Sequence, residues 1–279
     1  MHLASVDGAI VPATEARIPA TDEGLLRGDG IFEVMRLYRG RPFGLGAHLE
    51  RLGRSAHNLR LDIDVEAVHA DLEALLECAG PVEGLVRVVL TRGGRRLLFI
   101  EPLPGHLPAI RLGYVTYAPP RILTGVKSLS YGGNMLATRL AQERGYDEAL
   151  LVTPHGRVLE APTSSLFWAR DGELLTPPLS EHILDSITRR VVIEVTGAVE
   201  APCPREELEA ADEAFLASTV REVQPIAAVE ERALVLRNTI GQGGYVIAFA
   251  LAWISAPASL IVCGIVAVYY IHPGPLRLR

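Results

Sequence analysis

The first part of the chain carries two hydrophobic periods. Apolar residues three and four positions apart predict amphipathic helices at residues 45–59 and 65–78, and Gly80–Pro81 is a typical stop after the second. Strand-like runs fill residues 31–38, 85–91, 97–100 and 110–117, with a hairpin at residues 4–11 that turns at Asp7–Gly8. This pattern predicts a mixed α and β lobe.

The strand at residues 31–38 has two mainly apolar faces. At a period of two, Glu33 shares one face with Ile31 and Met35, whereas Arg36 lies on the other. We therefore expect a strand that is covered on both sides and aims its charges into a cleft. The stretch TDEGLLRGDG at residues 21–30 precedes it, and we interpret this stretch as a tight turn, because nucleotide-binding glycine loops lead into a helix.

A proline-rich break separates two halves. Residues 118–121 read APPR, which predicts a stiff linker between two lobes. Beyond it the pattern predicts a helix at 135–145, a strand at 148–152, paired strands within 157–168, a short strand from 174 and a helix at 191–196. We expect a small α+β domain at 1–118, a linker at 119–125, a large domain at 126–238 and a tail at 239–279.

Charge and cysteine content narrow the functional classes. The formal net charge is −6, and no basic stripe is evident, which argues against nucleic acid as the main partner. The three cysteines are far apart and show no metal-ligand spacing with histidine, so we predict free thiols in a reducing cytoplasm and no metal site. Small molecules are the expected partners.

Lys127 is the single lysine of the 279 residues, and the other basic side chains are all arginine. A lysine, unlike an arginine, can lose its proton in a desolvated pocket and attack a carbonyl to form a Schiff base. Lys127 lies shortly before a predicted helix start, whose positive end disfavours a protonated amine and is expected to lower the pKa of Lys127. Chance survival of one lysine is the alternative.

Three further stretches carry candidate chemistry. Glu160 lies at a bend among apolar residues, where a carboxylate is costly unless a cation or a protonated nitrogen meets it. Ser186 and Thr188 open a helix, which is a capping signal and also a potential phosphate site. The loop RGGRR at residues 92–96, with Arg95 inside it, could bind a carboxylate or be a solvated turn.

Taken together, these residues resemble the class IV, fold-type-IV pyridoxal-phosphate enzymes. That family includes branched-chain and D-amino-acid aminotransferases and aminodeoxychorismate lyases. The resemblance covers residues 5–230 and rests on several motifs in the family order. They are GDGIFEVMR at 28–36, HLERL at 48–52, VKSLSY at 126–131, DEALL at 147–151, GRVLE at 156–160, LLTPPL at 174–179, SITR at 186–189 and LASTVREVQPI at 216–226.

The resemblance implies a two-lobed α+β enzyme with pyridoxal 5'-phosphate as its cofactor. Lys127 matches the family's Schiff-base lysine, and Glu160 matches the glutamate that keeps the pyridine nitrogen protonated. The phosphate-binding positions of the family match Arg51, Ile187, Thr188 and Thr219. Substrate-binding positions are expected at Glu33, Arg36 and Arg95.

Two positions depart from the pattern. Branched-chain enzymes carry a tyrosine five residues after the lysine, and this chain has Gly132 there, with Tyr131 one residue earlier. The family asparagine after the glutamate motif is Ser165. Both changes place secondary contacts in question and leave the expected lysine and glutamate unchanged.

The resemblance predicts an aminotransferase that acts on a branched-chain-like amino acid and a 2-oxo acid. Aminodeoxychorismate lyase, which would release 4-aminobenzoate and pyruvate, is the first alternative, and D-amino-acid aminotransferase is the second. A cofactor-binding relic without activity is the non-enzymatic alternative. Family members are commonly homodimers, so a homodimer is expected.

The tail departs most from the family, which normally ends in a short amphipathic helix. Residues 244–271 are almost wholly apolar and long enough to cross a bilayer core of about 30 Å, with Pro257 within the run. A membrane anchor and a frameshifted end are the two main interpretations, and a buried core helix is disfavoured by length. An anchor would leave the catalytic part in the cytoplasm.

Overall fold

The computed structural model describes residues 3–230, 232 and 233. They form two compact units. The first contains residues 3–106, Pro119–Leu136 and Thr219–Glu222, and the second contains Leu107–Ala118, Ala137–Ser218 and a segment that begins at Val223.

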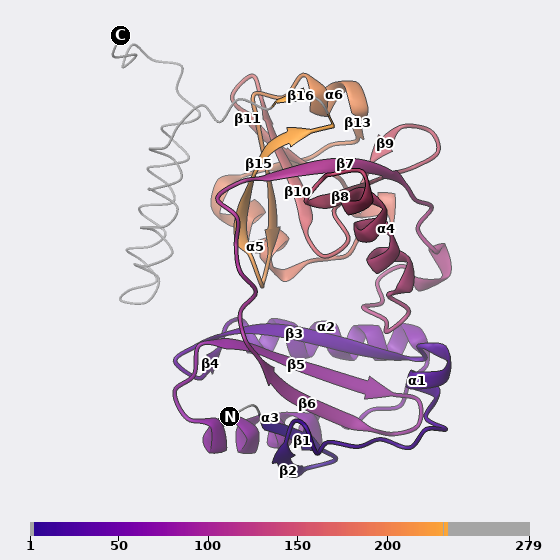
Figure 1. Cartoon of the computed structure of the whole chain (residues 1–279), viewed down its shortest axis with the longest axis vertical. Helices are drawn as coiled ribbons and strands as arrows, with labels where there is room; N and C mark the ends of the chain where they lie inside the picture. The colour runs from indigo at the N-terminus through magenta and orange to yellow at the C-terminus, as the bar shows by residue number, and fades with distance from the viewer. Residues whose placement is uncertain (1–2, 231, 234–279) are drawn as a thin grey trace. The chain divides into compact units, whose positions relative to one another are not determined.

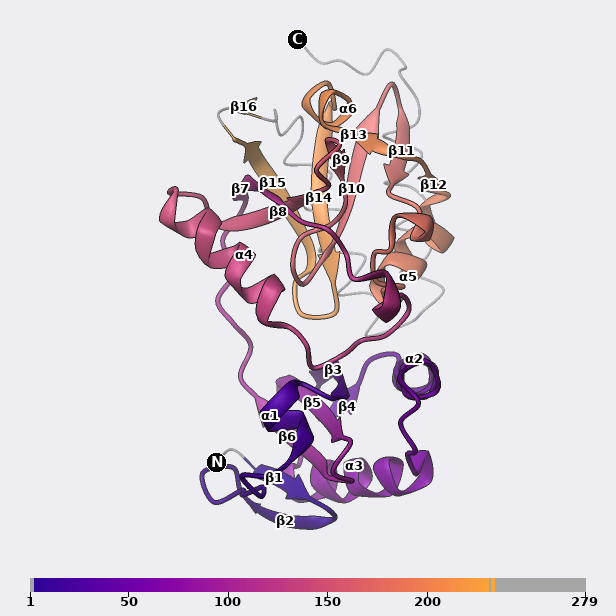
Figure 2. The ribbon, with the colours of Figure 1, turned by 90° about the vertical axis from the view of Figure 1, so that its right-hand side faces the viewer.

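The first unit is a six-stranded sheet with two long helices. Its strands have the order β2-β1-β6-β5-β3-β4, and each neighbouring pair is antiparallel. The helices α2 and α3 lie on one face of the sheet (Figure 2). The elements are β1 (Leu3–Val6), β2 (Ala9–Pro12), α1 (Glu23–Arg27), β3 (Gly30–Tyr38), β4 (Arg41–Pro42), α2 (Leu45–Leu59), α3 (Val65–Ala79), β5 (Gly84–Thr91), β6 (Arg96–Glu101) and η1 (Arg121–Leu123).

The strand β3 separates two apolar clusters. Its residues Ile31, Met35 and Leu37 pack with α2 and α3, and Phe32 and Val34 belong to a cluster on the opposite face. The alternation expected from the sequence is therefore confirmed. One expectation was wrong: Glu33 points at α2 and is buried, whereas it was expected to point into a cleft.

The second unit is built on a mixed ten-stranded sheet (Figure 1). Its order is β12-β11-β10-β14-β15-β7-β8-β9-β13, with β16 paired to β15. The elements are β7 (Ile110–Thr116), α4 (Gly132–Glu143), β8 (Glu148–Val152), β9 (Arg157–Val158), β10 (Ser165–Arg170), β11 (Glu173–Thr176), η2 (Leu179–Glu181), α5 (Ile187–Thr196), β12 (Val199–Glu200), β13 (Cys203–Pro204), α6 (Arg205–Glu209), β14 (Glu213–Ser218), β15 (Glu222–Val229) and β16 (Arg232–Ala233). The first residues of α4, up to Leu136, and Glu222 of β15 belong to the first unit.

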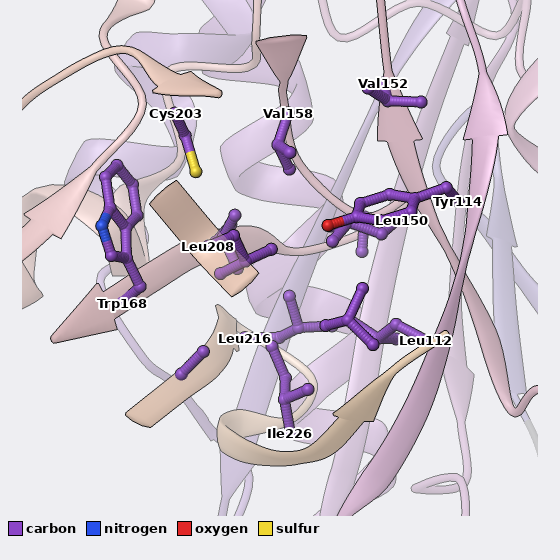
Figure 3. Close-up of a cluster of buried hydrophobic side chains, with 14 of the residues drawn as sticks. Leu112, Tyr114, Leu150, Val152, Val158, Trp168, Cys203, Leu208, Leu216 and Ile226 are labelled. Carbon is purple, nitrogen blue, oxygen red and sulfur yellow. The ribbon is translucent and has the colours of Figure 1, made fainter. Parts of the chain in front are cut away.

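The main core of the second unit lies against this sheet. Leu112 of β7, Leu150 of β8, Leu216 of β14 and Ile226 of β15 are fully buried and gather in one cluster (Figure 3). Trp168 of β10 closes the same cluster. Five strands, β7, β8, β10, β14 and β15, thus share one apolar interior.

The division into units differs from the expected division at two places. The strand β7, expected in the small domain, pairs in parallel with β8 and β15 and belongs to the second unit. The Lys127 segment, expected in the large domain, belongs to the first unit. Its backbone bonds to β3 explain this, because Phe32 N–H donates to Lys127 O at 3.0 Å and Leu129 N–H donates to Gly30 O at 2.9 Å.

The expected turn at residues 21–30 contains the short helix α1. Asp22 caps its start by accepting from Gly24 N–H at 2.8 Å, and Thr91 Oγ1 donates to the same carboxylate at 2.8 Å. Gly28 ends the helix in a left-handed conformation with φ of 67°. The glycines and aspartates of this stretch therefore have structural roles.

The apolar segment at 244–271, on which the predicted membrane association depends, lies outside the described residues. Among the helices that the structure describes, none is long and apolar enough to cross a membrane.

A buried ion pair lies between β3 and α2. Glu33 is 1 % exposed and Arg51 is 5 % exposed. Arg51 Nε donates to Glu33 Oε1 at 2.7 Å and Arg51 Nη2 to Oε2 at 2.6 Å, which is a bidentate pair. Burial alone would raise the pKa of Glu33, but the hydrogen bonds from Arg51 and His48 outweigh burial and lower that pKa to about 2. Glu33 is therefore ionised at neutral pH.

The first prediction concerns Gly30, which permits the Lys127 segment to approach β3. A Cβ on Gly30 would lie 2.4 Å from Leu90 O and 2.6 Å from a methyl carbon of Leu129. We expect Gly30→Ala to destabilise the protein by about 2 kcal/mol, measured by urea unfolding, because backbone and side chain must both shift. Gly53→Ala, in open space within α2, is the control and should stabilise by about 0.5 kcal/mol. Equal stability of Gly30→Ala and the wild type would show that the approach is not tight.

The second prediction concerns pH and the Glu33–Arg51 pair. At pH 7, Glu33→Gln should cost about 3 kcal/mol, because it leaves a buried guanidinium without its counterion. The pKa of Glu33 is lowered on folding from 4.5 to about 2, so wild-type stability falls as pH drops through this range, while the glutamine does not titrate. The difference in unfolding free energy should therefore shrink below pH 4.5.

Glu50→Gln is the matched control, because Glu50 is exposed on the same helix. It should change the unfolding free energy by less than about 0.5 kcal/mol at every pH. A Glu33→Gln difference that stays constant from pH 7 to pH 3 would contradict the lowered pKa of Glu33.

Candidate functional site

Lys127 is held from two sides within the first unit. Its carbonyl accepts from Phe32 N–H of β3, and its own N–H donates to Ser55 Oγ of α2 at 3.1 Å. The next residue, Ser128, forms an antiparallel bridge with Ile31. The lysine backbone is thus fixed by one strand and one helix, although the segment carries no long regular element of its own.

The side chain of Lys127 lies among aromatic rings. Its Nζ is 4.3 Å from the ring centroid of Phe32 and 5.8 Å from that of Tyr131. The two rings meet edge to face, with centroids 5.2 Å apart. An ammonium is stabilised over such a ring face. Tyr131, which is one position off the family tyrosine, is therefore placed beside the lysine.

The Glu33–Arg51 ion pair is extended by His48 of α2, which contacts the same carboxylate. His48 Nδ1 is 2.8 Å from Glu33 Oε2, and His48 is fully buried. His48, Arg51 and Ser55 are three and four residues apart on α2, so they share the face that meets β3 and Lys127. The apolar face of this helix therefore carries a polar stripe.

On the opposite face of the sheet lie two arginines that also belong to the first unit. Arg87 of β5 is directly opposite Val34, and its Cζ is 5.6 Å from the centroid of Phe32, the ring that also contacts Lys127. Arg36 is two residues beyond Val34 on the same face, with its Cζ 5.1 Å from the Tyr38 ring. Arg87 pairs with Glu101 through two hydrogen bonds of 2.9 Å, and both side chains are partly exposed.

Thr219 lies in the segment that joins β14 to β15. This segment is tied to β3, because Tyr38 Oη donates to Glu222 Oε1 at 2.6 Å. Burial, together with the Glu222 carboxylate, raises the pKa of Tyr38 above its ordinary value, so the phenol remains a donor. The first unit thus contains Lys127, Arg51, Arg36 and Thr219 of the predicted site.

The second unit contains Glu160, Ile187 and Thr188. Leu151 N–H donates to Glu160 O at 2.9 Å, which ties the bend to β8. The carboxylate Oε1 of Glu160 accepts from Leu184 N–H at 3.1 Å, so Glu160 is bonded to the segment that leads into α5. The predicted pyridine partner and the predicted phosphate helix therefore lie together in this unit.

The start of α5 has the features of an anion-binding site. Ser186 caps it by accepting from Arg189 N–H at 3.3 Å, and the first N–H groups of a helix have no acceptor within the helix. Arg189 is 2 % exposed; its Nη2 donates to Pro177 O at 2.7 Å and also pairs with Glu200. This buried arginine anchors the first turn, so Ile187 and Thr188 are held in place. The helix begins at Ile187, four residues before the start expected from the sequence.

Two sequence assignments to substrate are not supported by the geometry. Glu33 is buried and bonded to Arg51 and His48, which leaves it no surface to offer a ligand. Arg95 Nη1 donates to Asp7 Oδ2 at 2.7 Å, and its loop joins β5 to β6. Glu33 supports α2, and Arg95 supports the β1–β2 turn.

Sequence reasoning missed Arg87 and His48 as individual site residues. Arg87 could have been found as the one charge within the apolar strand LVRVVLT. His48 lies in the HLERL motif, but that motif alone does not show that the ring is buried. Its burial depends on the position of Glu33 in the fold.

Each unit, taken by itself, carries donors that suit part of pyridoxal 5'-phosphate. The lysine is held by backbone bonds, and the start of α5 has a capped first turn. A half-buried carboxylate at Glu160 can face a protonated ring nitrogen. Arg51 offers a guanidinium, the preferred partner of a phosphate dianion. These chemistries are the ones that an aldehyde, a pyridine nitrogen and a phosphate require.

Comparisons with known proteins find similar chains among the aminotransferases and a related lyase. A putative branched-chain-amino-acid aminotransferase of Methanocaldococcus jannaschii is 32% identical over 255 residues, covering 82% of this chain and 88% of the relative. An aminodeoxychorismate lyase of Bacillus subtilis is also 32% identical, covering 81% and 86%. Among solved structures, a branched-chain aminotransferase from Thermoproteus uzoniensis, determined with norvaline, superposes with a TM-score of 0.80 at 28% identity and covers 95% of each chain.

The family model for amino-transferase class IV matches residues 30–229. This match covers more than half of the chain and includes Lys127, Glu160 and the start of α5. The structural agreement extends over nearly the whole described fold. The chain therefore belongs to the class IV aminotransferases, enzymes that use pyridoxal 5'-phosphate.

Proposed function

We propose that this protein transfers an amino group between a branched-chain-like amino acid and a 2-oxo acid, with Lys127 holding the cofactor through a Schiff base. The observation that carries the proposal is the position of the single lysine, whose backbone is fixed by β3 and α2 and whose Nζ lies over Phe32. A lysine that bonds covalently to a cofactor must bring its amine back to the same position after each turnover. Fixing its backbone from two sides serves that need.

The basic, acidic and polar residues of the proposed site have separate roles. The cofactor ring, when bound, supplies the electron sink that makes the substrate Cα acidic. Lys127 Nζ, once released from the cofactor, would be the base that takes the proton from the substrate Cα. Glu160 keeps the ring nitrogen protonated, and its bond from Leu184 N–H orients the carboxylate. Arg51 and Thr219 in the first unit, and the N–H groups of Ile187 and Thr188 in the second, would each be donors to the phosphate.

The substrate surface that we propose is the face of the sheet formed by Phe32, Val34 and Leu85. These side chains form one apolar cluster, which suits a branched aliphatic side chain. Arg36 and Arg87 border it, and an arginine is suited to a substrate carboxylate. The 2-oxo acid, with its carboxylates, would use the same arginines.

Aminodeoxychorismate lyase is the second candidate. The Bacillus subtilis lyase is as similar to this chain, at 32% identity, as the branched-chain relative. The same lysine would then remove a proton, and pyruvate would be eliminated from the substrate. A homodimer, expected from the resemblance, is part of the proposal in either case.

The third prediction tests the covalent lysine. We expect purified protein incubated with pyridoxal 5'-phosphate to show the visible absorption of a protonated Schiff base. Borohydride should then fix the cofactor on the peptide that contains Lys127, located by mass spectrometry. Lys127→Arg keeps the charge but cannot form the bond, and it should give neither signal. Label on the N-terminal amine, or none at all, would overturn the proposal.

The fourth prediction tests substrate class and the arginine assignment. We expect L-branched-chain amino acids with 2-oxoglutarate to turn over faster than a matched D-amino-acid panel, and aminodeoxychorismate offered separately to yield little 4-aminobenzoate. Arg87→Gln should raise KM for 2-oxoglutarate at least about tenfold, because a charge-assisted hydrogen bond is lost.

Arg95→Gln is the matched control, since Arg95 lies in the loop after β5 and is bonded to Asp7 of the β1–β2 turn. Its KM should stay within about twofold of the wild-type value. If Arg95→Gln raised KM as much as Arg87→Gln, Arg95 would have to be assigned to the substrate site. Fast release of 4-aminobenzoate without transamination would favour the lyase.

A further inference from the structure

The buried position of the Nε2 atom of His48 is energetically unfavourable. The imidazole is 0 % exposed, and within the part of the chain that the structure describes its Nε2 has no hydrogen-bond partner. A buried polar atom without a partner is unfavourable, and each such atom in a native structure calls for a reason. A leucine at this position would avoid the cost. The bond made by the other ring nitrogen must therefore contribute something that an apolar side chain cannot.

That other bond defines the state of the ring. Nδ1 lies 2.8 Å from Glu33 Oε2, and an ionised carboxylate can only accept, so Nδ1 carries the hydrogen. Burial lowers the pKa of His48 against the opposing attraction of Glu33, so the ring is neutral. A neutral ring with hydrogen on Nδ1 leaves Nε2 as a bare acceptor, which is the atom found without a partner.

The bond from His48 completes the coordination of Glu33. Oε2 accepts from Arg51 Nη2 at 2.6 Å and from His48 Nδ1, while Oε1 accepts from Arg51 Nε at 2.7 Å. Without His48, the carboxylate could rotate about its last side-chain bond and carry the guanidinium with it. With His48, the plane of the carboxylate is fixed from a second direction.

Fixing Glu33 fixes Arg51. A guanidinium has five N–H donors in one rigid plane, and the bidentate pair commits two of them, Nε and one from Nη2, to Glu33. The direction of the remaining donors then follows from the carboxylate plane. A neutral donor achieves this without adding a second positive charge beside Arg51, as an imidazolium or a lysine would.

We propose that His48 is a positioning residue, which acts through Glu33 to aim the Arg51 guanidinium at the cofactor phosphate. The inference rests on the proposed assignment of Arg51 to that phosphate. His48 itself contacts no cofactor atom in this account. Its contribution is to reduce the number of orientations that Arg51 samples before the phosphate arrives.

The test compares the dissociation constants of pyridoxal 5'-phosphate and of pyridoxal, which has the same aldehyde and ring but no phosphate. The ratio of the two constants isolates the phosphate. His48→Leu should lower the preference for the phosphorylated form about tenfold, the effect of one hydrogen bond to a charged group. Binding of pyridoxal should change by less than about twofold, since the mutated contact acts on the phosphate alone.

Two variants control for a general loss of structure. His48→Asn should restore most of the preference, because its amide nitrogen can take the place of Nδ1 and donate to Glu33. His57→Leu makes the same substitution on the exposed side of α2 and should leave both constants unchanged. Equal weakening of both ligands by His48→Leu would mean that His48 only supports the fold, and would overturn the proposal.

Arg51→Gln separates this inference from the proposed function. Loss of phosphate preference in Arg51→Gln, with no loss in His48→Leu, would overturn the role of His48 and leave the phosphate assignment intact. Full preference in Arg51→Gln would overturn both.

A spectroscopic measurement on the wild-type protein covers the case in which His48→Leu does not fold. Nitrogen-15 NMR at pH 7 of protein labelled at histidine, assigned by comparison with His48→Asn, should show a neutral His48 with hydrogen on Nδ1. Hydrogen on Nε2, or a charged ring, would contradict the proposal.

Discussion

The ion pair between Glu33 and Arg51 is the constraint on which the rest of the site depends. Two opposite charges are removed from water between a strand and a helix, and only near-ideal geometry makes this tolerable. The bidentate contact and the bond from His48 supply that geometry. Because both charges must stay satisfied, α2 cannot slide or rotate on β3. A buried pair of this kind contributes specificity of packing more than net stability.

The same strand and helix hold the reactive lysine. The strand β3 bonds to the carbonyl of Lys127, α2 bonds to its N–H through Ser55, and Phe32 provides the ring below its Nζ. A shift between β3 and α2 would therefore move the lysine and Arg51 together. The arrangement couples the lysine proposed as the covalent anchor of the cofactor to the arginine proposed for its phosphate. The apolar cluster around Phe32 and Val34 lies on the opposite face of β3, together with the arginines proposed for substrate.

The sequence alone predicted the alternation of β3, the helix at 45–59 with its full bounds, and the family to which the chain belongs. It misassigned Glu33, because a charge on an apolar strand face can point into a cleft or meet a buried countercharge, and the partner, Arg51, lies 18 residues away. It also assigned the Lys127 segment to the wrong unit. That segment has no hydrophobic period of its own, and its position is decided by backbone bonds to β3 that no local pattern encodes.

The central claim is that Arg51 keeps its pair with Glu33 while it binds the cofactor phosphate. A crystal structure of the protein with pyridoxal 5'-phosphate at pH 7 tests this most directly. The account predicts continuous density from Lys127 to the cofactor, both Arg51–Glu33 hydrogen bonds intact, and the phosphate within hydrogen-bond distance of the same guanidinium. A structure in which Arg51 has left Glu33, or in which the phosphate lies away from Arg51, would contradict it.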